Sequence, residues 1–102
     1  MTTEITKIIN GFKQFSETPY VDAIKFLKEY IEVEESGEAF FELGKALFFN
    51  GEYDESIEWL EKSDDFRKDA YIGLDHYRKE DFKSAVSHFE KFLSQNLSLI
   101  HI

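Results

Sequence analysis

The sequence predicts an all-helical protein built from three consecutive pairs of helices. An internal repeat is the first observation, because Gly11, Gly44 and Gly73 are each followed nine residues later by an aromatic residue. Within the copies, apolar residues recur at three- and four-residue intervals, the spacing of a helix with one buried face. Helix breakers are also scarce, with one Pro and five Gly in 102 residues.

The repeat extends beyond the glycine. Each aromatic residue is followed by a small residue three positions later, then by a β-branched residue, and then by a large apolar residue four positions after the small one. In chain order these residues are Tyr20, Ala23, Ile24 and Leu27, then Tyr53, Ser56, Ile57 and Leu60, then Phe82, Ala85, Val86 and Phe89. Five matched positions in three copies indicate a true repeat, and such units stack to bury their apolar surface.

Each copy is expected to form two helices joined by a short turn. Thr18 supplies an N-cap for the second helix, and Pro19 lies in its first turn, where a missing N–H is harmless. In the second copy, Asn50 and Gly51 interrupt the apolar pattern and indicate a turn. The six helices are expected at roughly 4–16, 20–34, 38–50, 53–64, 67–79 and 82–96.

The repeated glycines require a packing explanation. A Gly inside a helix costs about 1 kcal/mol relative to Ala. Each glycine is therefore expected to face the small residue of its partner helix, so that the two backbones approach closely. The expected pairs are Gly11 with Ala23, Gly44 with Ser56, and Gly73 with Ala85.

Residues 38–63 resemble a tetratricopeptide repeat. The matching features are the aromatic–x–x–Leu–Gly opening at 40–44, the Gly-acidic-Tyr turn at 51–53 and the small residue Ser56 in the second helix. The resemblance implies a right-handed superhelix of antiparallel helix pairs whose first helices line a concave groove. It also implies that the groove binds segments of other proteins and that the protein is not an enzyme.

The flanking copies depart from the family pattern. Polar residues replace large apolar ones in the first helix, which is therefore expected to be rotated or loosely packed; they are Lys7, Asn10 and Gln14. Asp69 and His76 depart similarly in the third copy. The copies are 33 and then 29 residues apart, against a family period of about 34, so the turn around 63–65 is expected to be tight.

The chain is expected to be a single domain, 1–102. Its three repeats are placed at roughly 4–36, 37–65 and 66–96. They are followed by an apolar tail, 97–102, that is too short for a polar capping helix.

Composition excludes several classes of function. With 12 Lys and Arg against 21 Asp and Glu, the net charge is −9, which disfavours nucleic acid as a partner. The absence of Cys excludes disulfides and thiolate chemistry. No signal peptide or membrane-spanning apolar run is present, so a cytoplasmic protein is expected. No nucleotide or phosphate fingerprint occurs, and no cofactor is expected.

The first helices carry more apolar residues than core packing requires, which suggests a groove for an apolar or amphipathic segment of a partner. The alternative is that several of these aromatic residues pack between neighbouring helix pairs. The residues expected in the groove are Ile8, Phe12, Phe41, Lys45, Phe48, Phe49, Tyr71, Leu74 and Arg78.

A groove that grips a terminal carboxylate is disfavoured. Of the positions that carry Lys, Arg or Asn in such members of the family, only Arg67 fits; the others are Ile8, Phe12, Glu42 and Tyr71. The histidines lack metal-ligand spacing. His76 is expected to be a half-buried packing residue and His88 a surface residue, while His101 lies in the tail.

Self-association is the second functional hypothesis. The last helix and the tail are apolar and lack a cap, so a symmetric homodimer would cover them. The residues expected to mediate it are Val86, Phe89, Phe92, Leu93, Leu99 and Ile100. A further alternative is that the chain is the start of a longer solenoid, whose next repeat covers this end.

Overall fold

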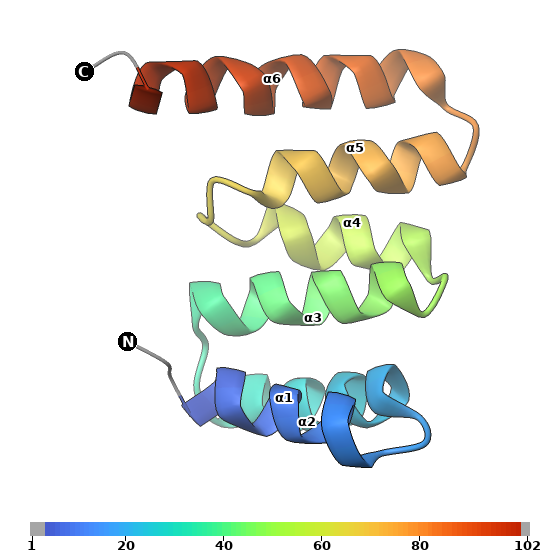
Figure 1. Cartoon of the computed structure of the whole chain (residues 1–102), viewed down its shortest axis with the longest axis vertical. Coiled ribbons are helices and arrows are strands. Elements are labelled where there is room, and N and C mark those ends of the chain that lie inside the picture. The colour runs from blue at the N-terminus through green and yellow to red at the C-terminus, as the bar shows by residue number, and fades with distance from the viewer. Residues whose placement is uncertain (1–3, 101–102) are drawn as a thin grey trace.

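The computed structural model describes the backbone of residues 4–100 and the side chains of residues 4–95, and all six elements in this range are helices. They are α1 (Glu4–Phe15), α2 (Pro19–Val33), α3 (Gly37–Phe49), α4 (Tyr53–Glu61), α5 (Lys68–Arg78) and α6 (Phe82–Ile100). The helices are stacked in chain order, and each packs against the next (Figure 1). The predicted all-helical fold and its six helices are confirmed.

The helix boundaries follow from local chemistry. Pro19 begins α2, and the Ser36 side chain caps α3 by accepting a hydrogen bond from the Ala39 N–H at 3.2 Å. Gly51 adopts a φ of 82° in the turn between α3 and α4. The equivalent turn of the third copy places Glu80 at a φ of 64°. That conformation is costly for a residue with a Cβ atom, so the turn at Glu80 is strained, whereas the turn at Gly51 is not.

Two apolar clusters hold the stack together. The larger one lies among α1, α2 and α3 and includes the fully buried Leu27, Leu43 and Leu47. The smaller one joins α3, α4 and α5 through Phe41, Leu60 and Ile72.

Two of the three repeated glycines lie where close packing requires them. A Cβ atom on Gly44 would lie 2.4 Å from the Leu60 Cγ, and one on Gly73 would lie 2.5 Å from a ring carbon of Phe89. The glycines thus make room chiefly for the large apolar residue of the second helix. The small residue also makes contact in the second pair, where the Ser56 hydroxyl lies 2.8 Å from the Gly44 carbonyl oxygen.

The prediction for Gly11 was wrong. Within the described part of the chain, and leaving aside its sequence neighbours and the nearby backbone of its own helix, no heavy atom would lie within 4 Å of a Cβ atom at this position. Helix α1 instead turns Ile5 and Ile9 into the core, where they are 5% and 6% exposed. This orientation agrees with the expectation of a rotated first helix.

The third copy follows the second after only 29 residues because helix α4 is short, and not because the turn after it is tight. Helix α4 has only 9 residues, against 15 in α2, and ends at Glu61 instead of the predicted 64. The connection that follows is held by Ser63, whose hydroxyl donates to the Gly37 carbonyl at 3.1 Å and accepts from the Asp65 N–H at 3.1 Å.

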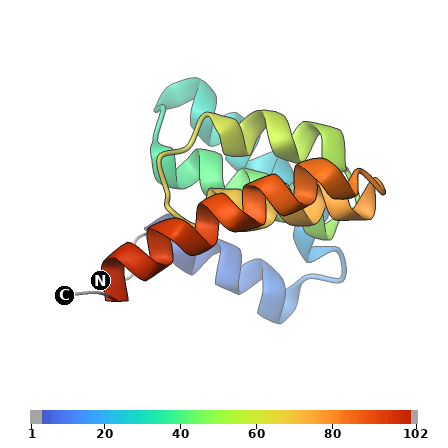
Figure 2. The same ribbon diagram turned by 90° about the horizontal axis from the view of Figure 1, so that it is seen from above.

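The last helix is longer than predicted. Helix α6 has 19 residues and α5 has 11, and the C-terminal part of α6 extends beyond α5 (Figures 1 and 2). Residues 97–100 of the predicted tail therefore continue the helix, while residues 101–102 lie outside the described range.

We expect Gly44→Ala to destabilise the protein by about 1–3 kcal/mol, because the buried Leu60 cannot move away from a new methyl group. Gly11→Ala is the matched control and should stabilise by about 0.5–1 kcal/mol, since it adds helix propensity without a clash. Urea unfolding followed by circular dichroism measures both. Equal effects at the two positions would contradict the assigned packing.

Candidate functional site

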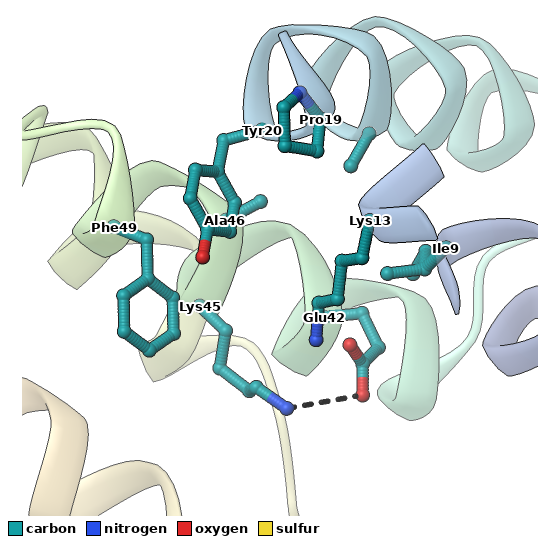
Figure 3. Close-up of a pocket in the computed structure, with 9 residues that line it drawn as sticks. Ile9, Lys13, Pro19, Tyr20, Glu42, Lys45, Ala46 and Phe49 are labelled. Carbon is teal, nitrogen blue, oxygen red and sulfur yellow. Dashed lines mark ion pairs between the residues drawn. The ribbon is translucent and has the colours of Figure 1, made fainter. Parts of the chain in front are cut away.

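A hollow opens where the first pair of helices meets the second. It lies between α1, α2 and α3, and its free space of about 10 Å³ is enough for about one water molecule (Figure 3). Apolar side chains form most of its wall, and three charged residues complete it. The lining residues are Ile9, Lys13, Pro19, Tyr20, Ala23, Glu42, Lys45, Ala46 and Phe49.

An aromatic cluster continues from the hollow towards α5. We define it as Tyr20, Phe48, Phe49, Tyr53 and Tyr71. Tyr20 stacks on Phe49 at a centroid distance of 5.3 Å, and Tyr71 meets Phe49 edge-on at 6.3 Å. Phe49 remains 49% exposed although it lies at the centre of these contacts. Its ring is held in place by its neighbours yet is accessible from outside.

The charged groups of the hollow are mainly cationic. The Lys45 Nζ lies 3.6 Å from a Glu42 carboxylate oxygen and 5.3 Å from the centre of the Phe41 ring. Lys13 extends from α1 toward the same side (Figure 3). The hollow thus has two ammonium groups for one carboxylate, in a chain whose net charge is −9.

The structure brings together only part of the predicted groove. Ile8, Phe49 and Arg78 are exposed. The other predicted groove residues, apart from Phe41, are half-buried; they are Phe12, Lys45, Phe48, Tyr71 and Leu74. Phe12 packs against the larger apolar cluster and meets Phe26 edge-on at 6.1 Å, so it belongs largely to the interior.

The structure corrects the placement of Phe41 on the groove surface. Its ring is 1% exposed and belongs to the smaller apolar cluster. Tyr71 covers one edge of the ring at 5.6 Å, and the Arg67 guanidinium lies 4.4 Å from the ring centre. The side chain is therefore part of the core.

The contribution of α2 to the hollow was not predicted. Pro19, Tyr20 and Ala23 line it, although they had been identified only as a helix start and as repeat positions. The sequence signal was present, since Tyr20 is the aromatic residue that recurs nine positions after the glycine in each copy of the internal repeat. The stacking of Tyr20 on Phe49, which had been predicted as a groove residue, became apparent only from the packing of α3 against α2.

Arg67 is engaged within the protein. Its guanidinium donates to both carboxylate oxygens of Asp65, at 3.0 and 2.8 Å. These bonds are the main reason why the pKa of Asp65 is lowered and that of Arg67 is raised. The pairing leaves Arg67 less able to bind a free carboxylate.

A polar cluster lies apart from the hollow, between α5 and α6. The rings of His76 and His88 stack at 5.4 Å, and the His88 Nδ1 lies 3.0 Å from a carboxylate oxygen of the buried Asp69. His76 is half-buried as predicted, whereas His88 is half-buried rather than on the surface. Within residues 4–95, no group of three or more potential ligands could hold a metal ion.

Some of the residues predicted for self-association are exposed, and others pack within the chain. Val86 and Leu93 are 53% and 54% exposed on α6. Phe89 packs on Gly73, and Phe92 stacks on Phe66 at 6.4 Å, so both have partners within the chain. The side chains of Leu99 and Ile100 lie outside the described residues.

We expect Phe41→Ala to destabilise the protein by about 3–5 kcal/mol, because it leaves a cavity in the core. Phe49→Ala should cost only about 1 kcal/mol, since half of that ring is already in water and chiefly ring contacts are lost. Thermal unfolding of both variants measures the difference. Similar losses would contradict the assignment of one residue to the core and the other to the surface.

Comparison with known proteins agrees with this architecture. No helix among the residues searched is long and apolar enough to cross a membrane. Residues 37–69 match the family model of the tetratricopeptide repeat, and no curated protein matches the chain. The matched segment begins at Gly37, where α3 begins, and extends through α4 into the start of α5. Members of this family are typically non-enzymatic modules that mediate protein–protein interaction. Residues 37–69 of the chain are thus similar to a tetratricopeptide repeat.

Proposed function

We propose that the chain is an adaptor that binds a segment of a partner protein in the hollow and along the aromatic cluster. The observation that supports this most strongly is Phe49, a ring held by Tyr20 and Tyr71 but 49% exposed beside a concave apolar wall. A rigid, accessible aromatic side chain next to a cavity is typical of a residue that anchors a partner.

The apolar wall indicates what the partner inserts. Ile9, Ala23 and Ala46 line the hollow and offer no hydrogen-bonding side chain, so an apolar side chain is the group that gains most by entering it. With free space of only about 10 Å³, the hollow accommodates the tip of one such side chain and not a folded domain.

The charges indicate what flanks that side chain. Lys13 and Lys45 outnumber Glu42 at the hollow, and the Lys45 ion pair is long at 3.6 Å. A carboxylate of the partner would therefore meet favourable potential here, in contrast to the acidic surface elsewhere. We infer that the bound segment is amphipathic, with an apolar side chain near an acidic one.

A peptide selection tests this proposal. Peptides selected from a random phage-displayed library on the intact protein should share an apolar residue near an acidic one. Phe49→Ala should weaken their binding by about tenfold, which corresponds to about 1.4 kcal/mol. Fluorescence anisotropy with labelled synthetic peptides measures the dissociation constants.

Charge variants provide the matched control. Lys45→Glu should weaken the same peptides by about tenfold at low salt and less at high salt. Lys25→Glu makes the same charge change on the exposed surface of α2 outside the hollow and should leave affinity within about twofold. Equal affinity for wild type, Phe49→Ala and Lys45→Glu would refute binding at this site.

Self-association through α6 is a second candidate function, favoured by the exposure of Val86 and Leu93. These residues are seven positions apart and lie on one face of the helix. An antiparallel pairing of two α6 helices would place Val86 of each copy opposite Leu93 of the other, which is the reciprocal contact of a two-fold interface.

Light scattering at about 100 µM tests this candidate. A dimer that Val86→Glu or Leu93→Glu converts to a monomer, with unchanged circular dichroism, would support it, because a buried carboxylate opposes association. A wild-type monomer at this concentration would refute it.

A further inference from the structure

A buried polar chain links α3, α4 and α5. Ser56 and Asp75 are both fully buried, at 0% exposure. The Ser56 Oγ lies 2.8 Å from the Gly44 carbonyl oxygen and 2.7 Å from the Asp75 Oδ2. The second carboxylate oxygen, Oδ1, is buried and has no hydrogen-bond partner among the residues that the structure describes.

The number of hydrogens in this chain determines its protonation. A serine hydroxyl has one hydrogen, and the Gly44 carbonyl and an ionised Asp75 are both acceptors. If Asp75 is ionised, one of these two acceptors faces the Ser56 oxygen without a hydrogen between them, which is costly in the interior. If Asp75 carries a proton, its O–H donates to Ser56 Oγ, and the Ser56 hydroxyl donates to Gly44. Each donor then has one acceptor.

The charged neighbours do not compensate an ionised Asp75. Lys79, the residue that follows α5, favours the ionised form and Asp54 of α4 opposes it, but these two residues form an ion pair with each other at the surface. Helix α3 contributes the Gly44 carbonyl oxygen rather than a charge. The nearby histidine on α6, His88, is bonded to Asp69.

We propose that Asp75 is protonated in the folded protein at mildly acidic pH and that loss of this proton above neutral pH loosens the packing of α5 against α3 and α4. This inference goes beyond the binding of a partner and does not depend on it. It nevertheless bears on the aromatic cluster, because α5 carries Tyr71.

The direction of the pH effect follows from the pKa values. Burial raises the pKa of Asp75 to about 7, while the Ser56 hydrogen bond and Lys79 act in the opposite direction. In the unfolded chain the pKa of an aspartate is about 3.9. The folded state therefore holds the proton more tightly, so stability decreases as pH rises from about 4 to about 7 and then levels off.

Urea unfolding of the full chain at pH 5 and pH 8 tests the proposal. Asp75→Asn mimics the protonated carboxyl, because its amide donates to Ser56 and cannot ionise. Over this pH range the unfolding constant of the wild type should rise by up to about a hundredfold relative to that of Asp75→Asn. Parallel pH profiles of the two proteins, within about twofold, would overturn the proposal.

Glu58→Gln is the matched control, since it removes one carboxylate from the exposed side of α4. It should reproduce the wild-type pH profile. If Glu58→Gln flattened the profile as Asp75→Asn does, the dependence would belong to net charge and the proposal would fail.

Two measurements on the wild type do not depend on how well a variant folds. The ¹³Cγ resonance of Asp75 should titrate with a midpoint near 7, and a midpoint near 4 would overturn the proposal. Between pH 5 and pH 8 the rate of amide exchange, corrected for its intrinsic pH dependence, should increase more in α5 than in α1 and α2. Unchanged protection of α5 would refute the loosening.

Discussion

The stack depends on the seating of a large apolar side chain on a glycine of the preceding helix. Leu60 occupies the space above Gly44, and Phe89 occupies the space above Gly73. Because a Cβ atom at either glycine would overlap the partner side chain, each contact fixes both the separation and the register of two helices. The first pair lacks this contact at Gly11, and its helix α1 has accordingly turned Ile5 and Ile9 inwards.

The orientation of α1 is also what positions the candidate binding site. By burying Ile9 next to α2 and α3, α1 places Lys13 at the edge of the hollow, beside Lys45 of the next pair. The site therefore forms at the junction of two repeats and not within either one. Its aromatic wall extends to Tyr71 of the third pair, so its geometry depends on all three pairs.

The third pair of helices buries more polar side chains than the second. Asp69 and Asp75 are buried in α5, and each has one carboxylate oxygen without a hydrogen-bond partner in residues 4–95. Such groups are costly in an interior, whereas apolar residues would not be. Glu80, which has a positive φ in the following turn, adds local strain. These features are destabilising and lie in α5 and the turn after it, while the larger apolar cluster holds α1, α2 and α3 together.

Sequence alone was enough to predict the six helices, the repeat and the resemblance to the tetratricopeptide repeat, because helix periodicity and the spacing from Gly to aromatic are local properties of the chain. It also identified Phe49 and Lys45. Tertiary packing decided that Phe41 is core, that Gly11 lacks the close contact seen at Gly44 and Gly73, and that Tyr20 and Lys13 join the hollow. Those outcomes depend on the rotation of each helix about its axis, and this rotation is set by the fit of side chains from distant segments. The meeting of Ser56, Gly44 and Asp75 is likewise a property of three packed helices and not of any one of them.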